Sequence, residues 1–354
     1  FRSMSCAWDC AWRAPSNMTS TNHRNIKYYF EGEVAGLLIF LIAVVVAFSL
    51  ASPNFLTATN LSSMAIQLPA LGLLTLAMLI PILSGGLNLS ITYTANMSGL
   101  ALAWTLQALG GPEAGVEVFV LGCALALTVG ALSGFVIGVI VAYTKAHPIL
   151  VSLSMMILMR GIGEFLSRGK DITGFPKFVQ EIGQGAIWGI PIPMLVFIVC
   201  AVAWHIILSR TRQGFGTYML GSNIMATAYS GVATKRNLIV LYTLSGLMCA
   251  VAGIVMLSQF NSVRVGHGES FLLITVLACF LGAADPFGGF GRVLPVFLAL
   301  VILQVLSSGL NILGANQHLS TALWGIFLLA VVILRWAWWR YSAKLKWKLE
   351  EPNN

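Results

Sequence analysis

Charged residues are scarce in this sequence. Only 9% of its 354 residues are Asp, Glu, Lys or Arg, whereas 58% are hydrophobic; an ordinary soluble domain has about 25% charged residues. This composition excludes a water-soluble globular protein. The net charge is +8, but the basic residues are not interleaved with aromatic residues on a polar segment long enough to form a domain. We therefore expect no nucleic-acid partner.

Motifs for catalysis and cofactor binding are also missing. The chain has no G-x-x-x-x-G-K-[ST] loop, so we expect any ATP to be bound by a separate subunit, and no cofactor in this chain. It has no G-x-S-x-G, HExxH or dinucleotide motif, and its five His residues are each alone. The six Cys residues are scattered, and no His or Cys pair accompanies Cys6 and Cys10. We expect no catalytic residue, no metal site and no enzyme activity.

Long apolar runs dominate what is present. A helix needs about 20 residues to cross the hydrocarbon core, and ten runs approach that length. Because the runs are continuous rather than alternating, they predict an all-α, polytopic transmembrane bundle and not a barrel. The expected spans are Val34–Leu50, Leu61–Leu83, Ile91–Leu109, Val116–Tyr143, Ile149–Leu166, Met194–Ser209, Asn237–Ser258, Phe271–Ala284, Val293–Leu313 and Leu319–Trp336.

The distribution of Lys and Arg predicts the orientation. With ten spans and a cytoplasmic N-terminus, 15 of the 20 basic residues fall on the cytoplasmic side, four fall on the other side, and Arg160 lies within a span. Cytoplasmic loops of membrane proteins carry such an excess, so we expect both termini in the cytoplasm. We expect residues 1–27 to be a disordered or vector-derived leader, 28–339 the transmembrane domain, and 340–354 a basic cytoplasmic tail, with Trp336, Trp338 and Trp339 as interfacial anchors.

Polar segments within and between the spans carry the functional candidates. Ser84–Ser90, with sequence SGGLNLS, is either a broken-helix element at membrane depth or a plain turn. Residues 210–236 are either a solvated loop or a protein-docking element; their centre, Asn223–Tyr229, favours a short helix with Ser222 as a possible N-cap. Asp285 is interpreted as a turn residue. Arg160 and Glu164 are four residues apart, which suits either a structural ion pair or a role with substrate or ion.

Four segments together resemble the permease subunits of bacterial ATP-binding-cassette importers of the ribose, galactose and xylose group, which includes autoinducer-2 and sugar-alcohol permeases. The segments are SPNFLTATNL (52–61), SGGLNLS (84–90), GSNIMATAYSGV (221–232), and LGAADPFGGFGR (281–292) continued by SSGLNILG (307–314). The resemblance extends from about Tyr28 to Leu334. Asn88 stands where the family usually has Asp, and Ile91-Thr92-Tyr93 replaces Val-Gly-Ser, so this region is bulkier and uncharged.

The resemblance implies the site residues. It implies a segment that couples the permease to a separate nucleotide-binding ATPase, comprising Gly221, Asn223, Ala226, Ser230 and Gly231. Near the translocation path it implies Gly85, Gly86, Asn88 and Ser90.

The resemblance also implies the partners and the function. The expected partners, besides the lipid bilayer, are two ATPase subunits, a periplasmic sugar-binding protein, and a second permease copy or a paralogue. The expected function is import of a small neutral sugar, ribose-like, or of a polyol across the bacterial inner membrane. The residues alone also allow a stand-alone, ion-coupled secondary transporter in which Glu164 is the coupling group.

Overall fold

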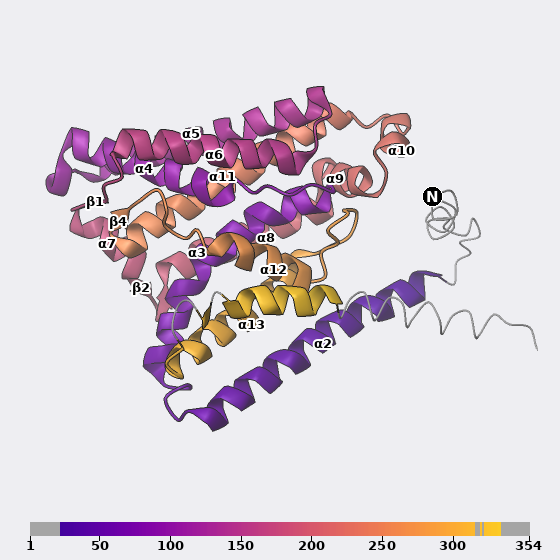
Figure 1. Ribbon diagram of the computed structural model, residues 1–354, viewed down its shortest axis with the longest axis horizontal. Helices are drawn as coiled ribbons and strands as arrows, with labels where there is room; N and C mark the ends of the chain where they lie inside the picture. The colour runs from indigo at the N-terminus through magenta and orange to yellow at the C-terminus, as the bar shows by residue number, and fades with distance from the viewer. Residues whose placement is uncertain (1–21, 316–318, 321, 334–354) are drawn as a thin grey trace, which may run out of the picture.

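A computed structural model describes residues 22–315, 319–320 and 322–333 of the chain, and the side chains from Val34 onward. The described part is a bundle of helices with a few two-residue strands (Figure 1). The helices are α2 (Asn22–Ala51), α3 (Ala58–Leu83), α4 (Ile91–Leu109), the 3-10 helix η1 (Gly111–Glu113), α5 (Val116–Thr144), α6 (Pro148–Ser167), α7 (Lys177–Gln184), α8 (Ile192–Arg210), α9 (Arg212–Ser222), α10 (Ile224–Tyr229), α11 (Thr234–Phe260), α12 (Phe271–Leu281), α13 (Val293–Ile312) and the helix Ala322–Ile333.

Two antiparallel strand pairs accompany the helices. β1 (Ile172–Thr173) pairs with β4 (Ser262–Val263), and β2 (Ala186–Ile187) pairs with β3 (Ile190–Pro191). Figure 1 shows these strands and α7 at one end of the bundle, and α9 and α10 at the opposite end. The two ends of the bundle therefore carry different structures.

Small residues bring α5 and α11 into backbone contact. Gly130, Gly134 and Gly138 recur every four residues and form one stripe along α5. A Cβ atom on Gly130 would collide with the carbonyl oxygen of Gly246 in α11, and one on Gly134 would collide with that of Tyr242. Spacing of this kind lets helices approach closely in lipid, where packing replaces the hydrophobic effect as the driving force. The stripe therefore fixes α11 closely against α5.

Helix α3 is the other central element. Of its most apolar 18-residue window, 89% is buried inside the subunit, against 11% for the window Val34–Ala51 in α2. α3 packs against α8, α11, α12 and α13, whereas α2 packs along α13 at the edge of the bundle (Figure 1). α2 is therefore a peripheral helix with apolar side chains facing outward, and α3 is a core helix.

Seven described helices are long and apolar enough to cross a membrane: α2 from Val34, α3, α5, α6, α8, α11 and α13. The other three expected spans do not meet that standard. α4 has the length but carries the polar residues Thr92, Thr94, Asn96 and Ser98. The expected span Phe271–Ala284 is a shorter helix that ends at Leu281, and the described part of the last span is the short helix Ala322–Ile333. The polytopic helical fold is confirmed, while the count of ten stays a prediction.

The predicted segment boundaries are covered only in part. α2 begins at Asn22, inside the segment 1–27 that we expect to be a leader. Residues 1–21 lie outside the described residues, as do the interfacial aromatic residues after 333 and the basic tail 340–354.

Candidate functional site

Two short helices, α9 and α10, occupy most of the segment 210–236. Thr211 caps α9, since its hydroxyl oxygen accepts a hydrogen bond from the Gly214 N–H at 3.2 Å. α9 extends to Ser222, so the expected N-cap Ser222 is wrong. Asn223 caps α10 instead: its backbone is extended and its side-chain oxygen accepts the Ala226 N–H at 3.0 Å. Asn has this role because its short carbonyl reaches the free N–H groups of the first turn.

Helix α10 is exposed on nearly all sides. Thr227 is its one buried residue, while Ile224, Met225 and Tyr229 are exposed, Tyr229 to 87%. Gly231 follows with a left-handed backbone (φ 79°), and its N–H donates to the Ala228 oxygen at 3.2 Å. Figure 1 shows α10 at the extreme end of the bundle. An apolar helix held out in this way presents the expected coupling residues Asn223, Ala226, Ser230 and Gly231 on an accessible surface.

Gly221, at the base of this unit, belongs to a junction of three chain segments. A Cβ atom on Gly221 would collide with the Leu83 carbonyl oxygen and the Gly289 nitrogen. The Gly289 N–H donates to the Leu83 oxygen at 2.9 Å. A Cβ on Gly288 would lie 2.8 Å from the Cα atoms of both Gly221 and Gly85. We call Leu83, Gly85, Gly221, Gly288 and Gly289 the glycine junction.

The glycine junction depends on backbone conformations that favour glycine. Gly85, Gly288 and Gly289 have φ angles of 82°, 93° and 83°, a region that side chains disfavour and glycine enters freely. Asp285 shapes the adjoining loop, because its carboxylate accepts the Phe287 N–H at 2.9 Å and its backbone oxygen accepts the Gly288 N–H at 3.0 Å. The prediction of Asp285 as a turn residue is confirmed.

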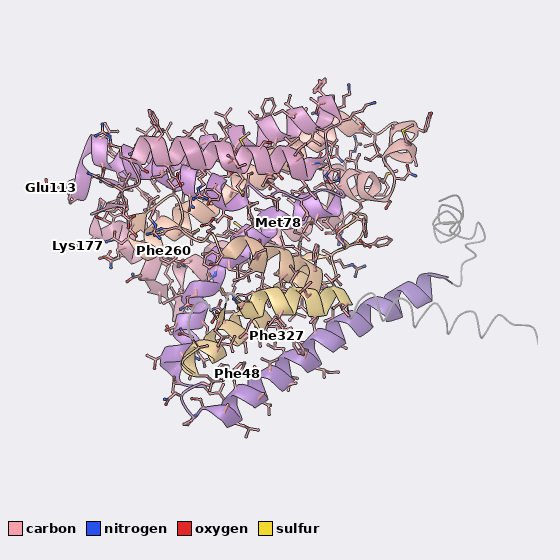
Figure 2. The ribbon with its side chains drawn as sticks, viewed as in Figure 1. Phe48, Met78, Glu113, Lys177, Phe260 and Phe327 are labelled. Carbon is pink, nitrogen blue, oxygen red and sulfur yellow. The ribbon has the colours of Figure 1, made fainter. Side chains whose placement is uncertain are left out.

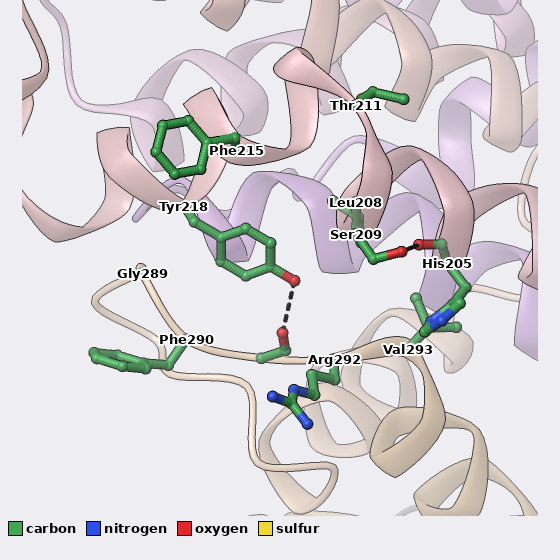
Figure 3. A pocket seen from close by; sticks show the side chains of 11 residues that line it. His205, Leu208, Ser209, Thr211, Phe215, Tyr218, Gly289, Phe290, Arg292 and Val293 are labelled. Atoms are coloured by element: carbon green, nitrogen blue, oxygen red, sulfur yellow. Dashed lines mark hydrogen bonds between the residues drawn. The ribbon is translucent and has the colours of Figure 1, made fainter. Parts of the chain in front are cut away.

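A cleft lies beside the glycine junction, between α8, α9 and the start of α13 (Figure 3). The Tyr218 hydroxyl donates to the Gly291 oxygen at 2.8 Å and so ties α9 to the loop before α13. Burial raises the pKa of Tyr218, and the nearby positive charge of Arg292 lowers it in part. The hydroxyl therefore keeps its proton, and the hydrogen bond, at neutral pH. The cleft encloses about 470 Å³ and is lined by His205, Leu208, Ser209, Thr211, Phe215, Tyr218, Gly289, Phe290, Gly291, Arg292 and Val293.

Ser84–Ser90 is a non-helical segment packed inside the subunit between α3 and α4. Asn88 is only 1% exposed. Its Nδ2 donates to the Ser245 hydroxyl at 3.0 Å, and its Oδ1 accepts the Ser90 N–H at 3.2 Å and the Ser90 hydroxyl at 2.7 Å. A Cβ on Gly86 would lie 2.5 Å from the Tyr242 hydroxyl oxygen. The segment is thus a break in the helical run that the side chain of Asn88 anchors to α11.

The structure separates the candidates of the sequence analysis into two groups joined at one point. Gly85, Gly86, Asn88 and Ser90 lie together in the subunit interior or at its junction with the loop before α13. Asn223, Ala226, Ser230 and Gly231 lie on the exposed unit, and Gly221 touches the backbone next to Gly85. The sequence analysis did not include Gly288 and Gly289 among the site residues. The adjacent glycines in DPFGGFG were the available signal.

The predicted pairing of Arg160 with Glu164 is confirmed, with Nε 2.9 Å from Oε1. The structure adds two partners that the sequence analysis missed, Tyr93 and Glu269. The Tyr93 hydroxyl donates to the Glu269 carboxylate at 3.0 Å, and Arg160 NH1 lies 3.8 Å from the same carboxylate. Their separation along the chain gave no local signal. In the described part of the chain, no group of three His, Cys, Asp or Glu side chains could hold a metal ion.

Comparison with known proteins gives consistent matches over most of the chain. The autoinducer 2 import system permease protein LsrD of Escherichia coli K12 is 29% identical over 335 residues, which are 93% of this chain and 98% of that protein. LsrD of Yersinia enterocolitica is 30% identical over 315 residues, 87% of this chain and 92% of that protein. No solved structure matches the chain significantly.

A family model agrees with these relatives and includes the site. The model described as branched-chain amino acid transport system / permease component matches residues 60–334. That range contains the glycine junction, α10 and the segment Ser84–Ser90, and it covers most of the described bundle. The chain therefore belongs to the permease family of the branched-chain amino acid transport system type.

Proposed function

We propose that this protein is the membrane-spanning permease subunit of an ABC-type importer that carries a small neutral sugar, ribose-like, or a related polyol. The family match and the similarity to import-system permeases support the transport role. The chain has no phosphate-binding loop, so the energy comes from a separate ATPase subunit that binds the ATP. The proposed location is the bacterial inner membrane, with both termini cytoplasmic.

One observation carries the coupling part of this proposal: the glycine junction joins the exposed α9–α10 unit to the segment Ser84–Ser90. Gly221 meets Leu83 and Gly289 through backbone atoms, with no side chain between them. Close-packed groups transmit a displacement because there is no free space to absorb it. A partner that moves α10 would therefore move the loop before α13 and the end of α3 together. Gly221, Asn223, Ala226, Ser230 and Gly231 are the proposed coupling residues.

The two ends of the bundle suit different partners. The proposed ATPase subunits dock on α10. The side chains of Ile224, Met225 and Tyr229 are exposed there, and a partner that buries them would remove apolar surface from water. The proposed solute-binding protein docks at the opposite end, beside α7 and the strand pairs (Figure 1). A second permease copy or a paralogue completes the translocation path, near which Gly85, Gly86, Asn88 and Ser90 would lie.

The character of the buried polar groups supports a neutral solute. Among the described residues, the buried polar side chains other than Tyr are Ser, Thr, Asn and Gln, and none carries a charge. A hydroxylated solute needs hydrogen bonds rather than counter-ions. The alternative, an ion-coupled carrier that uses Glu164, requires an ionisable group in the protein interior. The carboxylate of Glu164 already has a partner cation, since Arg160 Nε lies 2.9 Å from its Oε1, and this gives the alternative little support.

The experiment that tests the coupling assignment places a charge on α10. The chain is co-expressed with a candidate ATPase subunit, and ATP-driven uptake of labelled D-ribose is measured in proteoliposomes that also contain the candidate solute-binding protein. We expect Ala226→Glu to be inserted at normal abundance but to lose copurification with the ATPase and to lose uptake, since burying an unpaired carboxylate costs several kcal/mol. Ala58→Glu is the matched control: it places the same charge on an exposed residue at the start of α3, outside both proposed docking surfaces.

The two variants give distinct outcomes. Uptake by the Ala58→Glu control with loss in Ala226→Glu supports docking on α10. If Ala226→Glu retains both the ATPase and the uptake, α10 is a connector and the coupling assignment is wrong. If the unsubstituted complex binds the ATPase but does not import D-ribose, the docking stands and the proposed solute class fails.

A further inference from the structure

Three charged side chains within and beside α6 are exposed on the surface of the subunit. The side chains of Arg160 and Glu164 in α6 are 52% and 50% exposed, and that of Glu269, before α12, is 62% exposed. α6 is itself one of the helices apolar and long enough to span the membrane. Charged groups inside a bilayer face the protein interior or a water-filled cavity, because contact with hydrocarbon is costly.

The position of α12 sets the depth of Glu269. α12 ends at Leu281, next to the loop that reaches the glycine junction at the α9–α10 end of the bundle. Its 11 residues rise about 16 Å at 1.5 Å per residue, which is roughly half of the 30 Å hydrocarbon core. The segment 264–270 therefore folds back from β4 into the middle of the bundle. Non-helical backbone at this depth is tolerated where protein buries it or where it lines water.

Asn96 holds this re-entrant segment against α4. Its Nδ2 donates to the carbonyl oxygen of Val265 and, at 2.9 Å, to that of His267. Asn96 itself is buried, with a side chain anchored in a core helix. The carbonyl groups that a helix would have satisfied are thus satisfied by a side chain, and Glu269 is held at a fixed place beside α4 and α6.

The side chains form one connected group, which we call the polar cluster: Tyr93, Arg160, Glu164 and Glu269. Arg160 bonds Glu164 at 2.9 Å and approaches Glu269 at 3.8 Å, and its guanidinium carbon lies 5.8 Å from the centre of the Tyr93 ring. The Tyr93 hydroxyl donates to Glu269 at 3.0 Å. The cluster places two carboxylates and a forked cationic donor, all exposed, beside the buried ring of Tyr93.

The edge of α6 opposite Arg160 carries exposed apolar side chains. Leu158 and Phe165 are 52% and 82% exposed. At 100° per residue, they lie roughly 140–160° around the helix from Arg160. Ile157, 61% exposed, lies about 60° from Arg160, so the edge with the polar cluster mixes charged and apolar side chains. The charged groups on this edge are the ones that need water or protein around them.

We infer that the polar cluster lines the water-filled translocation path and hydrogen-bonds a neutral solute that carries adjacent hydroxyl groups; this inference rests on the proposed function. Carboxylate oxygens accept from pairs of hydroxyls, and the guanidinium donates several hydrogen bonds in a fixed plane. The positive charge of Arg160 partly neutralises the negative charge of Glu164. The cluster can therefore bind a neutral solute without an accompanying ion.

Cysteine accessibility tests the inference in the assembled complex. Arg160→Cys and Glu269→Cys, with Leu158→Cys as the lipid-facing control, are made in a chain whose Cys6, Cys10, Cys123 and Cys200 are replaced by Ala. The complex in proteoliposomes is exposed to a charged, membrane-impermeant methanethiosulfonate, with and without D-ribose. We expect the two cluster positions to react at least about tenfold faster than Leu158→Cys, since thiolates form in water and not in lipid, and we expect D-ribose to slow both reactions.

Each result decides a separate point. Equal, slow labelling at all three positions overturns the inference, and disulfide formation between Arg160→Cys residues of two copies would show that a second permease covers the cluster. Fast labelling that D-ribose does not slow, in a complex that imports D-ribose, overturns the solute contact. Glu269→Gln, which preserves the fold of the loop, is expected to raise the KM for D-ribose at unchanged ATPase copurification; an unchanged KM also overturns the contact. Loss of D-ribose import in the unsubstituted complex counts instead against the proposed function.

Discussion

The peptide nitrogen of Gly289 donates a hydrogen bond of 2.9 Å to the carbonyl oxygen of Leu83. This bond joins the loop before α13 to the last residue of α3, although the two residues are far apart in the chain. Gly221 packs on the same pair of atoms. Three segments that look unrelated in sequence are thus a single mechanical unit, and its properties can be tested one residue at a time.

Gly221→Ala is expected to impair the glycine junction. The added methyl group would overlap the backbone atoms of Leu83 and Gly289, which cannot rotate away as a side chain can. Overpacking of this kind costs typically 1–3 kcal/mol, so we expect a lower Tm in detergent and reduced ATP-driven uptake. Gly161→Ala in α6 is the matched control, because nothing lies within 4 Å of the position of its Cβ. Equal Tm values for the two variants would show that the close contact at Gly221 is not present.

Tyr218→Phe removes one hydrogen bond and leaves the ring in place. The lost bond to the Gly291 oxygen is worth about 1 kcal/mol, and the buried carbonyl loses a partner. We expect a modest loss of stability and weaker coupling, measured as uptake per ATP hydrolysed. Tyr143→Phe serves as the control, since Tyr143 is 64% exposed near the end of α5. A ratio of uptake to hydrolysis that stays at the unsubstituted value would exclude a coupling role for this bond.

Asn88→Ala is expected to destabilise the break between α3 and α4. The substitution leaves the Ser90 hydroxyl and N–H without their shared acceptor in the protein interior, at a cost of about 1–3 kcal/mol. Thermal unfolding of the purified protein and uptake measure this effect. Asn311→Ala, at an exposed position near the end of α13, provides the comparison. If Asn88→Ala has normal abundance, Tm and uptake, Ser84–Ser90 is a plain turn.

The orientation predicted from the basic residues can be tested at two described positions. A reporter inserted after Gly231, beside α10, is expected to behave as cytoplasmic, and one inserted next to Lys177, in α7, as periplasmic. The two positions lie at opposite ends of the bundle in Figure 1. Reporters that respond from the same side would contradict both the predicted orientation and the crossing of the bundle through the membrane.

The sequence by itself determined the membrane-spanning helical architecture and the permease resemblance. Long apolar runs can be read directly from the sequence. Because the thickness of the bilayer sets the length of a membrane-spanning helix, the length of each run indicates whether it can span. The same local signals placed a helix at Asn223–Tyr229, a turn at Asp285 and an ion pair between Arg160 and Glu164. The local signals wrongly predicted Ser222 as an N-cap. Ser222 is the last residue of α9, and the position of a cap depends on where the preceding helix ends.

Only the tertiary structure decided which of these segments meet. The packing of α3 against α12 and α13 brings Leu83 to Gly289, and the return of the chain between β4 and α12 brings Glu269 to Tyr93 and Arg160. Neither contact leaves a periodic pattern in the sequence. The partners are separated by whole helices, and no local hydrogen bond or repeat relates them. Their meeting is set by helix packing, in which glycines such as Gly134 and Gly246 determine how closely the backbones approach.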